Sequence, residues 1–201
     1  MYAKSLYSLV ILAFVALFAS ACSHYKEQAQ AAIAQAETAL EAISVDAQKY
    51  LPQKYQEVED AITAAKASLD KGDAKDALAA AKDLPAQVAA LGTEVAAAKQ
   101  QAIATLTDSW NSLSADLPKM VEAIQSRVDT LSKSKKLPKG LDQASFDAAK
   151  SGLDEIKGLW SAAEQSFNSG NIEDAVAKAN AVQQKGTEVM GLLGMKSAPA
   201  A

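Results

Sequence analysis

Residues 86–117 read AQVAALGTEVAAAKQQAIATLTDSWNSLSADL, and the pattern of this stretch is the strongest indication of the fold class. Its apolar residues recur three and four positions apart, in a nearly unbroken series from Val88 to Leu117. Such a period is typical of a continuous amphipathic helix that packs like a coiled coil. Only Gly92 interrupts the series, and glycine inside a helix costs about 1 kcal/mol relative to alanine. The sequence therefore predicts a central helix of about 48 Å at 1.5 Å per residue, which ends at Pro118.

The composition of the whole chain favours the same fold class. The 201 residues include 44 alanines, nine glycines and five prolines, and 49% are hydrophobic. Alanine is the best helix former and is depleted in strands. We therefore expect an all-α fold, an elongated antiparallel helical bundle built from two similar three-helix units around the long central helix.

Apolar stripes before the central helix predict three further helices. The first covers Gln28–Gln48 and is interrupted by Leu51-Pro52, since a residue before proline avoids the helical region. The second carries the stripe over 55–69. The third follows Asp73, which is suited to be its N-cap, and is broken or kinked at Pro85.

The pattern restarts after Pro118. The segments that we expect there are a helix over 121–131, a linker over 132–140, a helix over 146–167, a turn at 169–171, a helix over 172–193 and a frayed tail over 197–201.

A shift of 98 residues brings two halves of the chain into register. The matched pairs are Tyr55 with Leu153, Val58 with Ile156, Ile62 with Trp160, Leu69 with Phe167, Ser68 with Ser166, Gly72 with Gly170 and Asp76 with Asp174. Each half reads as a helix, a Leu-Pro break, a helix, a glycine turn and a helix. We therefore expect one helical unit over 22–100 and a second over 101–201.

The first 21 residues have the pattern of a secretory signal peptide. Lys4 provides a positive start, 9–18 is an unbroken apolar run, and three small residues precede Cys22. Ten apolar residues are too few for a bilayer core, which needs roughly 20. Cleavage by an ordinary signal peptidase would leave Cys22 as a free N-terminal thiol, and the alternative is that Cys22 is modified.

The sequence Ala-Ser-Ala-Cys at 19–22 resembles the bacterial lipobox, with Ala19 where that family usually has leucine. The resemblance implies that Cys22 becomes the lipid-modified first residue and carries three acyl chains. Ser23 at the next position resembles lipoproteins of the outer membrane, whereas inner-membrane lipoproteins of enteric bacteria have aspartate there. The implied location is the inner leaflet of the outer membrane, with the chain facing the periplasm.

Two short turns add a further resemblance. Residues 71–78 and 169–176 resemble the inner turn of a tetratricopeptide repeat, which implies a tight antiparallel helix pair in each half. The chain as a whole is similar to the small alanine-rich helical lipoproteins of bacterial envelopes.

Groups for catalysis or metal binding are scarce. The single cysteine excludes a disulfide, and His24 is the only histidine, so that neither a nucleophilic dyad of the usual kind nor a His/Cys metal site can be assembled. The acidic clusters at 57–60, 154–155 and 173–174 lie beside lysines, as on ordinary solvated helices. A cell-wall glycan hydrolase would depend on Glu57 or Glu155. We expect no enzyme activity, no cofactor and no metal.

Four aromatic residues on the stripes are candidates for binding, namely Tyr55, Trp110, Trp160 and Phe167. Core packing is the default interpretation, and a seam for a partner helix or an apolar ligand is the alternative. Lys133, Lys135, Lys136 and Lys139 form a basic cluster that suits a solvated linker or a contact with anionic lipid or peptidoglycan.

The function that these features favour is that of a lipid-anchored structural or protein-interaction module. Its partners would be the membrane, through the acyl chains, and an envelope protein or a second copy. A net charge of −4 with one arginine argues against nucleic acid. The alternative function is a carrier or chaperone for an apolar ligand between the two helical halves.

Overall fold

The computed structural model describes the backbone of residues 3–195 and the side chains of residues 24–195. Over this part the chain is helical and contains no strand, which confirms the predicted all-α class. The helices are α1 (Ala3–Tyr50), α2 (Pro52–Asp70), α3 (Ala74–Ala81), α4 (Leu84–Ser132), α5 (Gln143–Asn168) and α6 (Ile172–Leu192). The frayed tail expected over 197–201 lies outside the described residues.

The chain divides into two compact units, Met1–Gln100 and Gln101–Ala201. The first contains α1, α2, α3 and the beginning of α4. The second contains the rest of α4 together with α5 and α6.

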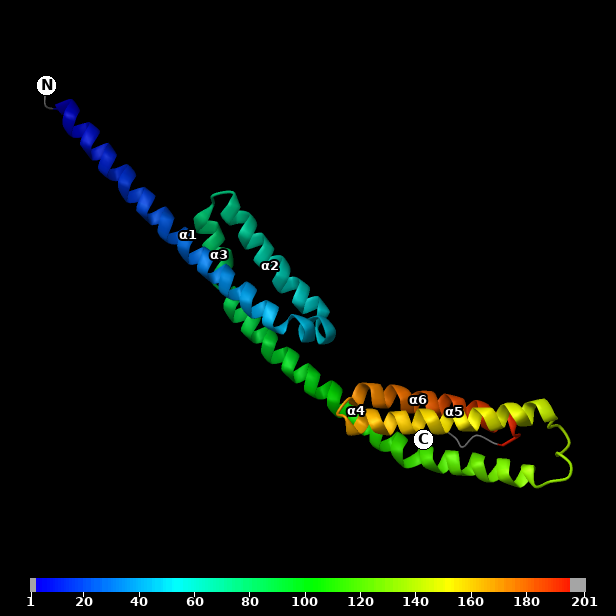
Figure 1. Ribbon diagram of the computed structural model, residues 1–201. Coiled ribbons are helices and arrows are strands. Elements are labelled where there is room, and N and C mark those ends of the chain that lie inside the picture. The colour runs from blue at the N-terminus through cyan, green and yellow to red at the C-terminus, as the bar shows by residue number, and fades with distance from the viewer. Residues whose placement is uncertain (1–2, 196–201) are drawn as a thin grey trace. The chain divides into compact units, whose positions relative to one another are not determined.

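The break between α1 and α2 lies at the predicted Leu-Pro pair. Leu51 leaves the helical region with φ −139° and ψ 57°, and Pro52 begins α2. Proline forces this change on the residue before it, whereas proline itself is tolerated in the first helical turn because no partner is needed there for its missing N–H. The chain thus reverses, and α2 lies beside α1 (Figure 1).

A glycine turn and a second proline shape the rest of the first unit. Gly72 has φ +86°, which favours glycine, and α3 follows it. Asp73 stands at the N-cap of α3 as predicted, but its side chain makes no capping hydrogen bond. The break at Pro85 is confirmed, since α3 ends at Ala81 and Pro85 lies in the first turn of α4.

Small side chains bring the helices of the first unit close together. Alanines in its core have no exposed surface, and Ile33, Ile62 and Leu84 fill the space between them. Ion pairs join the helices at the surface, with Lys66 Nζ 2.6 Å from Glu37 and Lys99 Nζ 2.8 Å from Asp46.

The predicted end of the central helix at Pro118 is wrong, because α4 continues to Ser132. Proline in a helix interior removes one hydrogen bond and costs about 3 kcal/mol. Leu117 and Ile124, on either side of Pro118, are 2% and 0% exposed and belong to one core. The seven-residue spacing of Trp110, Leu117, Ile124 and Leu131 places them on one face only if the helix continues, so that burial offsets the cost of the proline.

In the second unit, α5 and α6 form a helical hairpin that packs on α4 (Figure 1). Glycines allow close approach within this unit: a Cβ atom on Gly152 of α5 would lie 2.5 Å from Cγ2 of Val189 on α6. The predicted linker is a loop over 133–142 inside this unit. Leu137 and Leu141 of the loop pack against the core.

Candidate functional site

Three of the four aromatic candidates come together in the second unit. Trp110 of α4 stacks on Trp160 of α5, with ring centroids 5.7 Å apart and planes at 8°. Phe167, two turns further along α5, stacks on Trp110 with centroids 4.6 Å apart and planes at 9°. Nearly parallel aromatic pairs at such distances are stabilising beyond the area that they bury. We call these three residues the aromatic stack.

The aromatic stack is closed on one side and open on the other. Trp110 is 6% exposed and belongs to the core, as its place on the stripe predicts. Phe167 is 39% exposed, so the default expectation of core packing is wrong for this residue. It lies in the last turn of α5. Ile103, two turns before Trp110 on the same face of α4, is 43% exposed.

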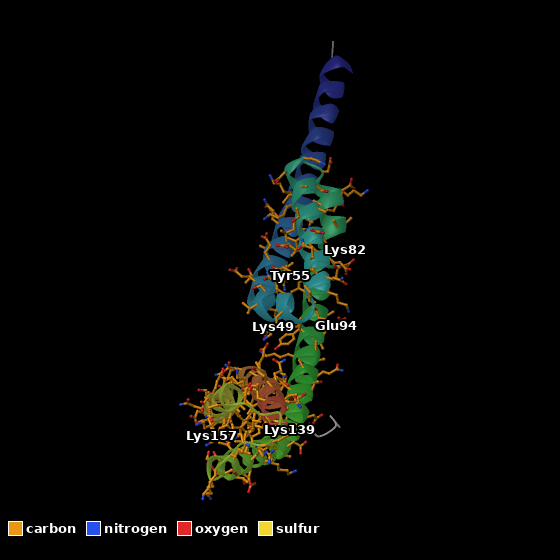
Figure 2. All side chains as sticks on the ribbon, turned by 90° about the vertical axis from the view of Figure 1, so that its right-hand side faces the viewer. Lys49, Tyr55, Lys82, Glu94, Lys139 and Lys157 are labelled. Atoms are coloured by element: carbon orange, nitrogen blue, oxygen red, sulfur yellow. The ribbon has the colours of Figure 1, made fainter. Side chains whose placement is uncertain are left out.

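The fourth candidate, Tyr55, belongs to the first unit and packs against that unit's own core (Figure 2). It lines a groove of about 350 Å³ between α1 and α2. Leu40 and Ile62 are the other large apolar residues of this groove, and the remaining lining residues are polar or charged. Tyr55 therefore packs in a different core from the other three aromatic residues.

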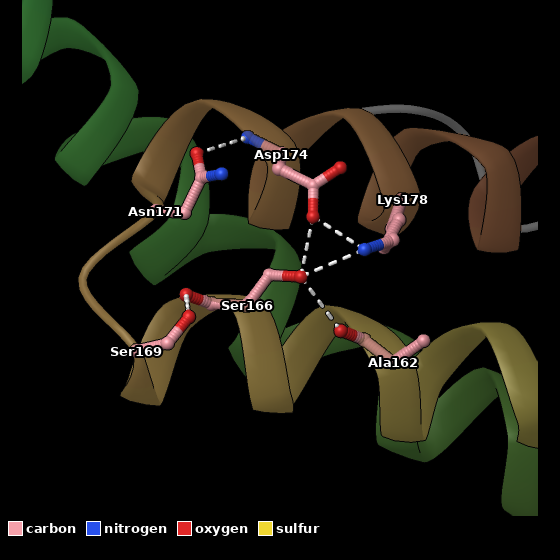
Figure 3. Close-up of polar contacts among 6 residues, drawn as sticks. All are labelled: Ala162, Ser166, Ser169, Asn171, Asp174 and Lys178. Carbon is pink, nitrogen blue, oxygen red and sulfur yellow. Dashed lines mark hydrogen bonds and ion pairs between the residues drawn. The ribbon is translucent and has the colours of Figure 1, made fainter.

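A polar cluster that the sequence did not predict ties α5 to α6 (Figure 3). Ser166 of α5 is 7% exposed. Its Oγ lies 2.5 Å from Oδ2 of Asp174, 2.8 Å from Nζ of Lys178 and 2.9 Å from the carbonyl oxygen of Ala162. Lys178 also forms an ion pair with Asp174, one turn away on α6. Serine, aspartate and lysine thus form a closed network at the hairpin end.

This network has the residue types of a serine–lysine dyad but not its chemistry. A nucleophilic serine needs a neighbour basic enough to take its proton, and Asp174, which accepts from the Ser166 hydroxyl, is a weak base because its pKa is lowered. Lys178 instead donates to both Ser166 and Asp174. Hydrogen bonds from Lys178 and Ser166 hold the pKa of Asp174 below its ordinary value of 3.8, so this carboxylate is ionised at neutral pH. The arrangement favours a structural lock on the α5–α6 turn.

The corresponding turn of the first unit lacks this lock. In the 98-residue register, Ser68 and Asp76 match Ser166 and Asp174, but Ala80 stands where the second half has Lys178. Lys178, which has no counterpart in the first half, is therefore the sequence signal that could have revealed the cluster. The start of α6 is stabilised separately by Asn171, whose side chain accepts a hydrogen bond from the Asp174 N–H at 3.2 Å.

The other polar candidates make ordinary surface interactions. His24 Nε2 lies 2.9 Å from the amide nitrogen of Gln28, one turn further along α1. Glu155 pairs with Lys185 at 3.2 Å, and Gln56 donates to Asp60 at 3.0 Å. Among the residues that the structure describes, no group of three or more histidine, cysteine or acidic side chains is placed to hold a metal ion.

Cys22 and the apolar run before it lie outside the residues whose side chains are described. In the part of the chain that the structure covers, no helix combines the length and the apolar character that a membrane span requires. No protein-family model matches the chain, and neither a curated protein nor a solved structure matches it.

Proposed function

We propose that this chain is a lipid-anchored, periplasm-facing helical lipoprotein of the bacterial cell envelope, acting as a structural or protein-interaction module and not as an enzyme. The observation that carries the proposal is the order of a positive residue, an apolar run and Ala-Ser-Ala-Cys at positions 4–22. One acyl chain binds a membrane only marginally, at about 0.8 kcal/mol per buried CH₂. Three chains on Cys22, as the lipobox resemblance implies, would make anchoring effectively permanent.

The exposed edge of the aromatic stack supports the interaction part of the proposal. Aromatic residues are enriched where proteins bind one another. Phe167 is large and 39% exposed, and it rests on the rigid, buried ring of Trp110. A partner helix could bury Phe167, in the manner of a helix that lays its apolar face in a groove.

The anchor is tested by intact mass spectrometry of the chain extracted from membranes of its native host. We expect a chain that begins at Cys22, with added mass equal to that of the acyl groups. Cys22→Ala should abolish the added mass, while the neighbouring Ser23→Ala should keep it. An unmodified chain that begins at residue 22, or one that keeps residues 1–21, would overturn the proposal.

The interaction role is tested by photocrosslinking in cells. A photoreactive amino acid at Phe167 should give a defined crosslinked product with one envelope protein or with a second copy. The matched control is Asp154, an exposed residue of the same helix, which should give none. Equal labelling at both positions would contradict a specific surface at the aromatic stack.

A further inference from the structure

The loop over 133–142, between α4 and α5, presents a concentrated positive charge. Its first seven residues read Lys-Ser-Lys-Lys-Leu-Pro-Lys, and Lys133, Lys135, Lys136 and Lys139 are all exposed. No acidic residue occurs between Asp129 and Asp142. The chain as a whole is acidic, so this loop is a local reversal of its charge.

We call the segment 133–142 the basic loop, and among the described residues its four lysines lack the ion pairs that most lysines on the helices form. Most described lysines on the helices form ion pairs, namely Lys54, Lys66, Lys99, Lys119, Lys150, Lys178 and Lys185. Within the described part of the chain, the four lysines of the basic loop pair with no carboxylate. The nearest acidic side chains along the chain are engaged elsewhere: Asp129 accepts from Gln125 at 2.8 Å, and Asp142 accepts from the Ser145 N–H at 2.7 Å.

The basic loop is held in place. Leu137 and Leu141 pack against the core of the second unit. The Ser134 hydroxyl donates to the Thr130 carbonyl at 3.0 Å, and the Leu141 N–H donates to the Pro138 carbonyl at 3.2 Å. The charges are thus presented together on an ordered loop at one end of the α5–α6 hairpin, opposite the Ser166 cluster (Figure 1).

The residue type indicates which partner the basic loop fits. All four charges are lysines, which act as hydrated point charges, whereas arginine forms the planar fork that recognises a single carboxylate or phosphate. The one large apolar side chain among them, Leu137, is turned to the core and cannot enter a partner pocket. These features suit a broad array of negative charge and not one defined anionic group.

We propose that the basic loop binds the phosphate headgroups of an anionic phospholipid surface. This contact is separate from the proposed acyl anchor, because it depends on charge in the second unit and not on Cys22. A bilayer surface potential of about −30 to −50 mV concentrates protons at the surface roughly threefold to sevenfold. Contact with the headgroups should therefore slow the acetylation of amines that lie at such a surface.

The test is brief acetylation of the full-length chain, read by mass spectrometry for each lysine. The chain is incubated with vesicles of phosphatidylcholine alone or with added phosphatidylglycerol. We expect acetylation of the basic loop to fall about threefold or more in the anionic vesicles, and to recover at 0.5 M salt, where the Debye length is only a few Å. The exposed Lys71, Lys75 and Lys82 of the first unit are the controls in the same molecule and should not change.

Unchanged acetylation of the basic loop would overturn the proposal, and so would an equal fall at the three control lysines. Peptidoglycan sacculi replace the vesicles in a further arm, and protection there but not by vesicles would assign the loop to the cell wall instead. The intact mass of the same sample reports acylation of Cys22, so that failure of the anchor and failure of the loop contact are read separately.

Discussion

Gly152 of α5 is a position where one methyl group changes the packing of the second unit. A Cβ atom there would lie 2.5 Å from Cγ2 of Val189, a stiff β-branched side chain. Overpacking a core costs typically 1–3 kcal/mol, which exceeds the gain of about 1 kcal/mol in helix propensity. We expect Gly152→Ala to lower the free energy of unfolding by about 1 kcal/mol in urea titrations.

Gly158, on the same helix, is the matched control because a Cβ atom there meets nothing within 4 Å. Gly158→Ala should stabilise the protein by up to about 1 kcal/mol. Adding Val189→Ala to Gly152→Ala should reduce the clash and give a cost smaller than the sum of the two single changes. Stabilisation by Gly152→Ala alone would show that α5 and α6 lie further apart than described.

The Ser166 cluster predicts a pH-dependent contribution to stability. The pKa of Asp174 is lowered in the folded protein, by hydrogen bonds from Lys178 and Ser166, from an ordinary value of 3.8. Ionised Asp174 therefore stabilises the fold at pH values above its ordinary pKa of 3.8. This stabilisation is lost as the pH falls through the lowered pKa of Asp174 in the folded protein. We expect Asp174→Asn to lower Tm at pH 7, with a difference from the unmodified chain that shrinks below about pH 4.

Asp76→Asn is the control for this experiment, since Asp76 occupies the equivalent turn of the first unit, where alanine replaces the lysine. Asp76→Asn should lower Tm at pH 7 by less than Asp174→Asn does. An equal loss from both variants at every pH would argue against a specific role for Lys178.

At the scale of elements, α4 shows tertiary packing overriding a local helix breaker. Pro118 interrupts backbone hydrogen bonding, yet core residues on both sides keep the helix continuous. Pro118→Ala restores an N–H donor and removes the ring, so it should stabilise the protein by up to about 3 kcal/mol, measured by thermal or urea unfolding. Pro52→Ala at the start of α2 should change stability little, because proline is favoured at that position. Loss of stability in Pro118→Ala would indicate that the proline ring itself packs favourably.

At the scale of the whole molecule, each unit has its own core filled by its own side chains. Trp110 is covered by neighbouring rings and is 6% exposed. We therefore expect tryptophan emission to stay unchanged when a fatty acid or a hydrophobic dye is added at micromolar concentration. A saturable shift that Trp110→Phe abolishes would instead favour the carrier function over the interaction module.

Much of the helix pattern could be predicted because its causes are local. The Leu51-Pro52 break follows from the steric effect of proline on the preceding residue, and the Gly72 and Gly170 turns follow from the positive φ that glycine tolerates. The apolar period predicted α5 closely, since burial of one face leaves a spacing of three and four in the residues. The anchor at Cys22 stays a prediction from sequence.

The amino-acid sequence by itself thus determined an all-helical protein, the positions of most breaks and most of the residues that face the cores. The three-dimensional structure was needed to show that α4 passes through Pro118, that Trp110 stacks on Trp160 and Phe167 while Tyr55 packs in the other core, and that Lys178 completes a network with Ser166. Periodicity specifies the face of a helix on which a residue lies. Which faces meet depends on the packing of side chains far apart in the chain, and this packing can offset the local cost of a proline.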